Sequence, residues 1–181
     1  MRNLVLYHLL SLDGVAEEPG DWMTDSGDEL VANLGRVIAD QDTVLLGRGT
    51  YDYWVDYWPS SSFQPFADFI NQTPKHVFTS SPLSGAWDNS TPIDARPEDH
   101  VADLKRQDGA DIAVHGSISL AQTLLHAGVV DELRLVIGST VAGPGRRLFT
   151  DDNPLQRFEL ADCNRTEHGT LLLHYRRAAA G

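Results

Sequence analysis

The fold of this chain is decided by one stretch, VHGSISLAQTLLHAG at residues 114–128. It follows an apolar run at residues 111–114 and predicts a strand, a tight turn at Gly116 and a helix. Ser117 is a favourable residue for capping that helix, and Gly128 stands where a glycine commonly ends one. Such a junction directs backbone N–H groups and the positive end of a helix toward a ligand such as a phosphate. Ordinary strand-to-helix turns of α/β proteins have the same pattern, so the junction alone leaves both interpretations open.

A second junction of the same kind lies earlier in the chain. The apolar run at residues 42–46 leads into Gly47, Arg48 and Thr50. Thr50 can cap a helix and donate to a phosphate, and Arg48 can bind one through two hydrogen bonds. The aromatic stretch at residues 51–58 follows. Its side chains could belong to the core, to a dimer surface or to a pocket wall.

Hydroxyl side chains follow a third predicted strand, at residues 75–79. Ser80 and Ser81 stand at the carboxyl end of this strand, where ligands collect in open α/β sheets. The same Ser-Ser-Pro sequence is also favourable turn chemistry, so the functional interpretation depends on what lies beside it.

The first predicted strand, at residues 2–10, ends in a turn at Asp13 and Gly14. The loop at residues 17–24 then carries Trp22. This side chain could cover a ligand at the edge of the sheet, or it could simply dock a surface loop onto the core.

Acidic side chains cluster where the first long helix is expected to begin. Residues 26–29 resemble a capping box, and apolar side chains then recur at helical spacing through Ile38. Asp25, Asp28 and Glu29 would complement the dipole of that helix. Alternatively, one of these carboxylates faces a pocket and supplies a proton or binds a ring nitrogen.

Composition excludes several classes of function. The net charge of −12 over 181 residues argues against nonspecific nucleic-acid binding. No apolar run approaches the roughly 20 residues of a membrane span, and the N-terminus lacks a signal-peptide cleavage site. We therefore expect a cytoplasmic protein without a nucleic-acid or membrane partner. The scattered histidines lack metal-ligand spacing, so no metal is expected. The single cysteine, Cys163, is expected to be a small buried residue.

Strands and helices alternate up to about residue 128, and strands then follow one another. Residues 158–165 and 170–177 read as a hairpin. This order predicts an α/β fold with a mostly parallel central sheet and antiparallel strands at the C-terminus. We expect one domain over residues 1–177 and a short tail at 178–181.

Together and in this order, these segments resemble the dihydrofolate reductase-like family that includes the C-terminal reductase domain of the riboflavin biosynthesis protein RibD. The matching segments are SLDG at 11–14, LLGRGTY at 45–51, KHVFTSS at 75–81, HGS at 115–117, GVVDELR at 128–134 and GPGRRLF at 143–149. The resemblance implies a dihydrofolate reductase-like, three-layer α/β/α fold. It also implies NADPH as the hydride donor.

The resemblance further implies which residues contact the cofactor. They are Asp13, Gly14, Val15 and Ala16 beside the nicotinamide; Gly47, Arg48, Thr50, His115, Gly116, Ser117 and Ile118 at the phosphates; and Thr79, Ser80 and Ser81 near the adenosine ribose and its 2′-phosphate. An arginine and hydroxyls at that last position would favour NADPH over NADH.

Dihydrofolate reductases carry one acidic residue in the helix after the first loop. No carboxylate of this chain aligns with it cleanly, and the candidates here are Asp28 first and Asp25 second. Trp22, Tyr51 and Trp54 are candidates for stacking on a flat substrate ring.

These expectations describe an NADPH-dependent reductase that resembles 5-amino-6-(5-phosphoribosylamino)uracil reductase. The zinc deaminase half is absent, because the chain lacks its Cys-x-x-Cys motif, so a stand-alone reductase-like domain is expected. The alternatives are a reductase of another pterin, imine or carbonyl compound, and a nucleotide-binding protein without catalysis. The resemblance also implies a homodimer, for which the apolar strand at 129–138 and the aromatic stretch at 51–58 are candidate contacts.

Overall fold

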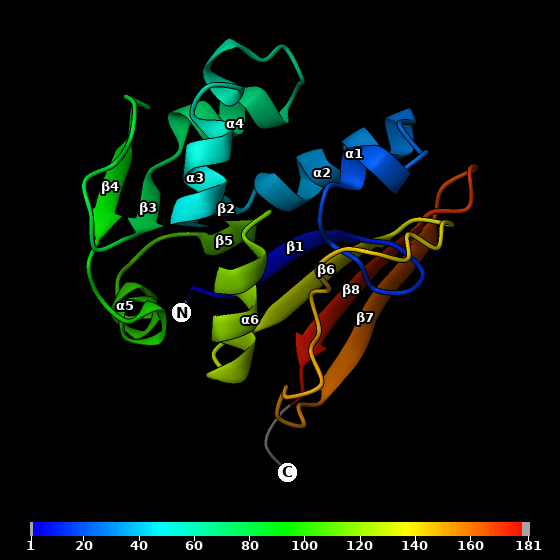
Figure 1. The fold of residues 1–181 in the computed structure, drawn as a ribbon. Helices are drawn as coiled ribbons and strands as arrows, with labels where there is room; N and C mark the ends of the chain where they lie inside the picture. Colours follow the sequence, from blue (N-terminus) through cyan, green and yellow to red (C-terminus); the bar gives the residue numbers. More distant parts are fainter. Residues whose placement is uncertain (1, 179–181) are drawn as a thin grey trace.

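The structure, a computed structural model, describes residues 2–178 and is built around one eight-stranded sheet (Figure 1). The strand order is β4-β3-β2-β5-β1-β6-β8-β7. The strands are β1 (Leu4–Leu10), β2 (Gln41–Gly47), β3 (Lys75–Phe78), β4 (Ser90–Ile93), β5 (Asp111–His115), β6 (Glu132–Ile137), β7 (Phe158–Arg165) and β8 (Leu171–Arg177). Strands β1 to β6 pair in parallel, whereas β8 is antiparallel to both β6 and β7. The predicted α/β class, with antiparallel strands at the C-terminus, is confirmed.

Helices cover both faces of the sheet (Figure 1). They are α1 (Pro19–Trp22), α2 (Asp28–Ile38), α3 (Arg48–Trp54), α4 (Phe66–Gln72), α5 (Pro97–Lys105) and α6 (Ile118–His126), with a short 3-10 turn at Trp58–Ser60. Leu4 and Leu6 of β1 pack under α5 and α6, whereas Tyr7 packs under α2. This alternation follows from the two-residue period of a strand, and it makes β1 apolar on both faces. None of the helices within residues 2–178 is long and apolar enough to cross a bilayer.

The order of the strands brings distant segments to one edge. Strand β5 inserts between β2 and β1, although β2 follows β1 in the chain. In register, Val114 of β5 lies beside Leu45 of β2 and Leu6 of β1, so β5 and β2 end close together, whereas β1 continues to Leu10. The loops that follow them therefore share the carboxyl edge of the sheet, where α/β proteins bind ligands.

Strand β7 forms the outer edge of the sheet, and nearly all of its side chains are exposed. Cys163 lies on this strand and is exposed. The prediction of a buried cysteine was wrong, because no strand or helix of the described chain covers β7 on its outer side. Ala178, the first residue of the predicted tail, donates its N–H to Arg157 O, and residues 179–181 lie outside the described chain.

The start of α2 also differs from the predicted capping box. Gly27 is the residue before the helix, and its N–H donates to Asp25 Oδ1 at 2.9 Å. Glu29 does not reach back to cap the helix; its Oε2 accepts the N–H of Glu167 in the β7–β8 hairpin at 2.7 Å. The acidic cluster therefore joins α2 to the hairpin.

Candidate functional site

The two glycine junctions meet at the carboxyl edge of the sheet. Gly47 ends β2 and Gly116 follows β5, and these strands are neighbours. Ser117 precedes α6, but its hydroxyl does not cap that helix. Instead, Ser117 Oγ accepts the backbone N–H of Gly47 at 3.0 Å. One hydrogen bond thus fixes the starts of α3 and α6 relative to each other, and both helices direct their N–H groups to this edge.

The turn at Gly116 requires a glycine for two reasons. Its φ is +68°, and a Cβ atom there would lie 2.6 Å from Cζ2 of Trp54 in α3. The half-buried Trp54 ring therefore rests directly on the backbone of this turn. Of the three aromatic residues predicted to stack on a substrate, Trp54 is the one placed beside the glycine junctions.

Arg48 joins the second junction to the hydroxyls after β3. Its Nη1 donates to Ser81 Oγ at 2.8 Å, to Pro82 O at 2.8 Å and to Thr79 Oγ1 at 3.3 Å. Its Nε lies 2.8 Å from both carboxylate oxygens of Asp52. The guanidinium is thus held in place while its side chain stays 31% exposed. Arg48, Thr79 and Ser81 therefore lie together, and Ser80 stands exposed between the two hydroxyls.

The loop after β1 is anchored by Asp13. The Asp13 carboxylate accepts the Ser11 hydroxyl at 2.7 Å and the N–H groups of Ala142 and Gly143, each at 2.9 Å. Arg147 also lies 3.4 Å from Asp13 Oδ2. The Ser11 hydroxyl first, and then these N–H groups, lower the pKa of Asp13 to about 2. The side chain of Asp13 therefore holds the loop after β6.

The residues that follow Asp13 in this loop can contact a ligand mainly through their backbone. Gly14 adopts φ +82°, Val15 is 1% exposed and Ala16 is buried. A cofactor at this loop would therefore meet the main chain of residues 14–16. Ala16 N–H is already used, since it donates to Arg146 O at 2.9 Å.

The sequence analysis missed Arg146 and Ser119. Arg146 Nη2 donates to Ser119 Oγ at 2.6 Å, which brings an exposed guanidinium to the first turn of α6. The Gly/Pro-rich sequence at 140–149, with its two arginines, could have signalled this cation. Its position depends on Gly145, because a Cβ there would lie 2.7 Å from Val15 Cγ1.

Several predicted site residues have buried side chains, among them His115, Tyr51 and Ile118. His115 is 3% exposed, packs against Phe66 and Phe69, and has Nε2 2.8 Å from Gln41 Oε1. Burial lowers the pKa of His115 to about 3, so the ring is neutral. Tyr51 is 1% exposed and Ile118 is 8% exposed. Their side chains belong to the core, and only their backbone could meet a ligand at this edge.

Trp22, the last residue of α1, is docked onto the core. This is the second of the two alternatives that the sequence left open. It is 7% exposed, and its Nε1 donates to Glu17 O at 2.8 Å. The ring packs near Gly138, where a Cβ atom would lie 3.6 Å from Trp22 Cζ3. In this conformation the ring faces the end of β6 and not an open cleft.

Asp25 lies away from the glycine junctions, beside the β7–β8 hairpin. Asp25 is buried, and its Oδ2 accepts the Thr166 hydroxyl at 2.5 Å. That hydroxyl first, and the N–H of Gly27 next, lower the pKa of Asp25, so it is ionised at neutral pH. Strand β8 stands three strands from β5, or ~14 Å at the usual strand spacing. Asp28 is exposed in the first turn of α2.

No group of three or more metal-binding side chains occurs within residues 2–178. The site is instead built from backbone N–H groups, hydroxyls and two guanidinium groups, those of Arg48 and Arg146. This is an arrangement suited to phosphate oxygens.

Comparisons with known proteins identify the family of this chain. The sequence matches the profile of the RibD C-terminal domain over residues 2–172. It is 31% identical over 158 residues to the uncharacterized protein YyaP of Bacillus subtilis (strain 168), covering 83% of this chain and 81% of that protein.

Solved structures share the fold at low sequence identity. A putative riboflavin biosynthesis protein from Shewanella sp. PV-4 has a TM-score of 0.79 and 16% identity, over 98% of this chain and 99% of that chain. A diaminohydroxyphosphoribosylaminopyrimidine deaminase/5-amino-6-(5-phosphoribosylamino)uracil reductase from Thermotoga maritima has a TM-score of 0.69 and 17% identity, over 98% of this chain and 57% of that chain. These likenesses confirm the expected fold.

Proposed function

Because this chain belongs to the RibD C-terminal domain family, a family of reductase domains, we propose that it is an NADPH-dependent reductase of a small pyrimidine-like substrate. The observation that carries the proposal is the meeting of two glycine junctions, joined by the Ser117–Gly47 hydrogen bond. Each junction has a guanidinium and hydroxyls beside it: Arg48 with Ser81, and Arg146 with Ser119.

The residues at this edge fit a dinucleotide phosphate. Gly116 lets the Trp54 ring lie against the backbone of its turn, because a side chain there would collide with that ring. Ser117 and Thr50 lie at the first turns of α6 and α3, where backbone N–H groups lack helical partners. We assign the diphosphate to the two helix starts, with Arg146 as its neighbouring cation.

We assign the adenosine 2′-phosphate to Arg48, Thr79 and Ser81. Nη2 of Arg48 has no hydrogen-bond partner within the described part of the chain. Asp52 neutralises part of the guanidinium charge, so the hydroxyls of Thr79 and Ser81 share in binding this group. NADH lacks the 2′-phosphate, and the same residues would therefore favour NADPH.

NADPH supplies a hydride from its nicotinamide ring when it is bound. The chain itself contributes binding and orientation. The main chain of Gly14, Val15 and Ala16 borders the nicotinamide, and the loop keeps its shape because Asp13 anchors it. His115 and Tyr51 contribute by filling the core beneath the junctions.

We place the substrate between α1 and α3. The exposed Tyr53 hydroxyl of α3 lies 3.5 Å from Oε2 of Glu18, the residue before α1, so a side chain of α3 meets the start of α1 here. Trp54 is the aromatic side chain available for stacking. Asp28 is the proposed carboxylate contact, approached from α2. The uracil reductase activity named for the Thermotoga protein makes a ribosylaminopyrimidine the first substrate to test.

One observation favours a second candidate, a nucleotide-binding protein without catalysis. Asp25 is ionised and engaged with Thr166, so it is a poor proton donor. Both candidates share the nucleotide site and differ only in turnover.

The test follows oxidation of NADPH by absorbance with the ribosylaminopyrimidine phosphate, and separately with dihydrofolate. Turnover with the ribosylaminopyrimidine supports the proposal. Turnover with dihydrofolate alone would mean that the substrate is a pterin and not a pyrimidine. NADPH binding without turnover on either compound would favour the second candidate. The Arg48→Gln variant should need a higher NADPH concentration for half-maximal turnover, which controls for a contaminating reductase.

A further inference from the structure

The helices around the proposed substrate region, which lies between α1 and α3, carry most of the negative charge of the chain. Residues 17–74, which include α1 to α4, hold eleven carboxylates, two arginines and no lysine or histidine. Their formal charge is −9, out of −12 for the whole chain. These helices lie on one face of the sheet, whereas α5 and α6 lie on the other (Figure 1). A substrate bound between α1 and α3 therefore approaches the acidic face of the protein.

Aromatic and acidic side chains surround the substrate region. Glu18 precedes α1, Asp21 lies in α1 and Asp28 lies in the first turn of α2, and all three are exposed. Helix α3 contributes Trp54 and Tyr53, of which Tyr53 is 68% exposed. The Tyr53 hydroxyl lies 3.5 Å from Glu18 Oε2, so a carboxylate stands at the edge of this aromatic surface.

The two arginines of this segment are directed elsewhere. Arg48 binds Asp52 of its own helix and donates to Ser81 after β3, where we assign the 2′-phosphate. Arg36 lies in the last turn of α2, at ~12 Å along the helix axis from Asp28. It therefore stands near the start of β2, at the opposite edge of the sheet from the glycine junctions.

The arginines of β6 and β7 do not supply a cation to the substrate region either. Arg134 of β6 donates to Glu132 Oε2 at 3.1 Å, toward the amino end of that strand. Arg165 ends β7 and pairs with Leu171, so both side chains share one face of the sheet. Leu172, the next residue, packs with the core under α2, which places Arg165 on the opposite face.

The other basic groups are occupied, buried or on the far face. Arg146 is assigned to the cofactor diphosphate. His168, at the tip of the hairpin, lies close enough to Asp25 for their charges to interact. The two lysines of the chain are Lys75, which is 0% exposed, and Lys105, which lies on α5. An anionic group between α1 and α3 would therefore lie near carboxylates and would lack a partner among these basic side chains.

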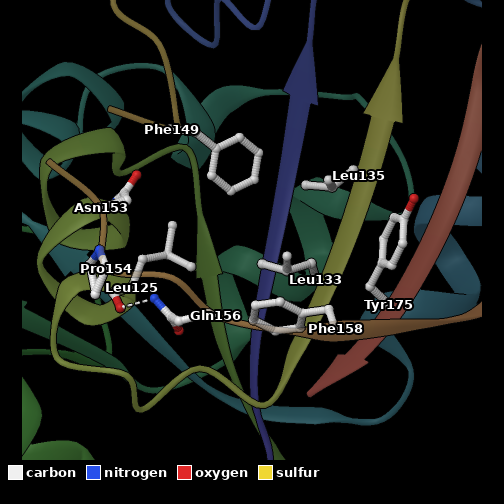
Figure 2. A pocket seen from close by; sticks show the side chains of 9 residues that line it. All are labelled: Leu125, Leu133, Leu135, Phe149, Asn153, Pro154, Gln156, Phe158 and Tyr175. Atoms are coloured by element: carbon white, nitrogen blue, oxygen red, sulfur yellow. Dashed lines mark hydrogen bonds between the residues drawn. The ribbon is translucent and has the colours of Figure 1, made fainter. Parts of the chain in front are cut away.

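The hollows on the α6 side of the sheet offer no alternative place for an anionic group. A pocket of about 380 Å³ lies between α6, β6 and β8, and apolar side chains such as Leu133 and Tyr175 line it together with two uncharged amides (Figure 2). A second hollow along α6 is lined by hydroxyl groups, His126 and the carboxylates of Glu98 and Asp152. Neither hollow, as residues 2–178 form it, is lined by an arginine or a lysine.

We propose that the substrate of this site is a flat ring compound without an anionic tail, uncharged or cationic at neutral pH. The inference rests on the proposed function, because it concerns the compound that accepts the hydride. The ring stacks on Trp54, and the carboxylates around it favour an amino group over a phosphate. The phosphate of the ribosylaminopyrimidine and the glutamate of dihydrofolate would both lie unpaired among like charges. Their counterparts without these groups avoid that cost.

Two matched pairs of compounds test the proposal at saturating NADPH. One pair is the ribosylaminopyrimidine phosphate and the riboside made from it with a phosphatase. The other pair is dihydrofolate and a dihydropterin that lacks the aminobenzoylglutamate. In a pair that turns over, kcat/KM should be at least about tenfold higher for the compound without the anionic group.

The outcomes separate this inference from the proposed function. An equal or higher kcat/KM for the anionic compound of a pair would overturn the inference and leave the reductase activity standing. Turnover with none of the four compounds would overturn the proposed function and this inference together.

Ionic strength distinguishes repulsion from binding by the sign of its effect. The Debye length falls from ~30 Å at 0.01 M salt to ~10 Å at 0.1 M, so added salt weakens interactions between exposed charges. The kcat/KM for the phosphorylated compound should therefore rise with salt, while that for the riboside stays nearly constant. A fall with salt for the phosphorylated compound would show that a cation binds its phosphate, and would contradict the proposal.

Glu18→Lys reverses one charge at the edge of the substrate region. It should raise kcat/KM for the phosphorylated compound relative to the riboside by at least about threefold. Asp99→Lys is the matched control, since Asp99 is exposed on α5, on the other face of the sheet, and the change in net charge is the same. It should leave the ratio unchanged. Circular dichroism should show both variants folded, because both side chains are exposed. An unchanged ratio in Glu18→Lys, or an equal change in both variants, would contradict the proposal.

Discussion

The hydroxyl oxygen of Ser117, just before α6, accepts the backbone N–H of Gly47 at the end of β2, at 3.0 Å. Seventy residues of sequence separate the two, yet β2 and β5 are neighbours in the sheet. The bond therefore holds two helix starts side by side, and the proposed phosphate site depends on it.

The first prediction concerns this bond. Ser117→Ala removes the acceptor of the partly buried Gly47 N–H, and the free energy of unfolding should fall by ~1–2 kcal/mol. The dissociation constant for NADPH should rise as well, since the two helix starts are no longer fixed. Denaturant unfolding and a nucleotide titration measure the two effects. Ser26→Ala, at an exposed serine before α2, should change neither. An unchanged free energy of unfolding in Ser117→Ala would show that the Ser117–Gly47 hydrogen bond does not stabilise the fold.

A second prediction separates backbone strain from collision. Gly116 and Gly128 share a φ of +68°, but a Cβ at Gly116 would meet Trp54, whereas one at Gly128 would meet nothing within 4 Å. Gly128→Ala should cost about 1 kcal/mol through backbone conformation alone. Gly116→Ala should cost clearly more, and it should alter the near-ultraviolet circular dichroism as Trp54 moves. An equal loss of unfolding free energy in the two variants would mean that the Trp54 ring moves aside without an energetic cost.

A third prediction concerns cofactor selectivity. Arg48→Gln removes charge-assisted hydrogen bonds to the proposed 2′-phosphate, each worth ~1.5–3 kcal/mol. The dissociation constant for NADPH should therefore rise about 10-fold or more, while that for NADH changes little. Arg36→Gln, at an exposed arginine of α2, is the control for loss of one positive charge. A parallel weakening of both nucleotides in Arg48→Gln would move the 2′-phosphate site elsewhere.

A fourth prediction distinguishes the two acidic residues. Asp28 is exposed, and Asp28→Asn should lower turnover while it leaves NADPH affinity and stability nearly unchanged. Asp25→Asn should instead lower stability, because the amide replaces a carboxylate that accepts the Thr166 hydroxyl and the Gly27 N–H. Steady-state rates and unfolding curves separate these outcomes. Full turnover in Asp28→Asn would remove Asp28 from the mechanism.

A fifth prediction concerns acid stability. Burial lowers the pKa of His8 to about 4 and that of His115 to about 3, below the ~6.5 of an unfolded histidine. Between these values the unfolded chain binds more protons, so stability should fall as pH drops below about 6.5. Each histidine contributes up to ~1.4 kcal/mol per pH unit in this window. His115→Gln should flatten the dependence by about one proton between pH 4 and 6. An unchanged slope would show that His115 is protonated in the folded protein.

The sequence predicted the order and type of the elements well, because their signals are local. The apolar run before Gly116 and the helical spacing after Ser117 are sufficient to specify β5 and α6. The hairpin at residues 158–177 was likewise predicted closely. The resemblance added the pairing of the two glycine junctions, which no local signal contains.

The errors concern contacts between distant segments. The capping box at residues 26–29 satisfies a local pattern, yet Glu29 binds the hairpin at Glu167, a partner that only the fold supplies. Cys163 is expected from the sequence to be a small buried residue of a strand, and its exposure depends on β7 being an edge. Arg146 was missed for the same reason: it reaches Ser119 through the long loop after β6.

The measurement that tests the central claim most directly is a titration of the purified protein with NADPH and, in parallel, with NADH, followed by tryptophan fluorescence. Trp54 lies against Gly116, so a nucleotide at this junction should quench the signal. We expect saturable binding of NADPH that is at least about tenfold tighter than that of NADH, and weaker in Ser117→Ala. Absence of binding by either nucleotide at millimolar concentration would contradict the assignment of the two glycine junctions as a dinucleotide site.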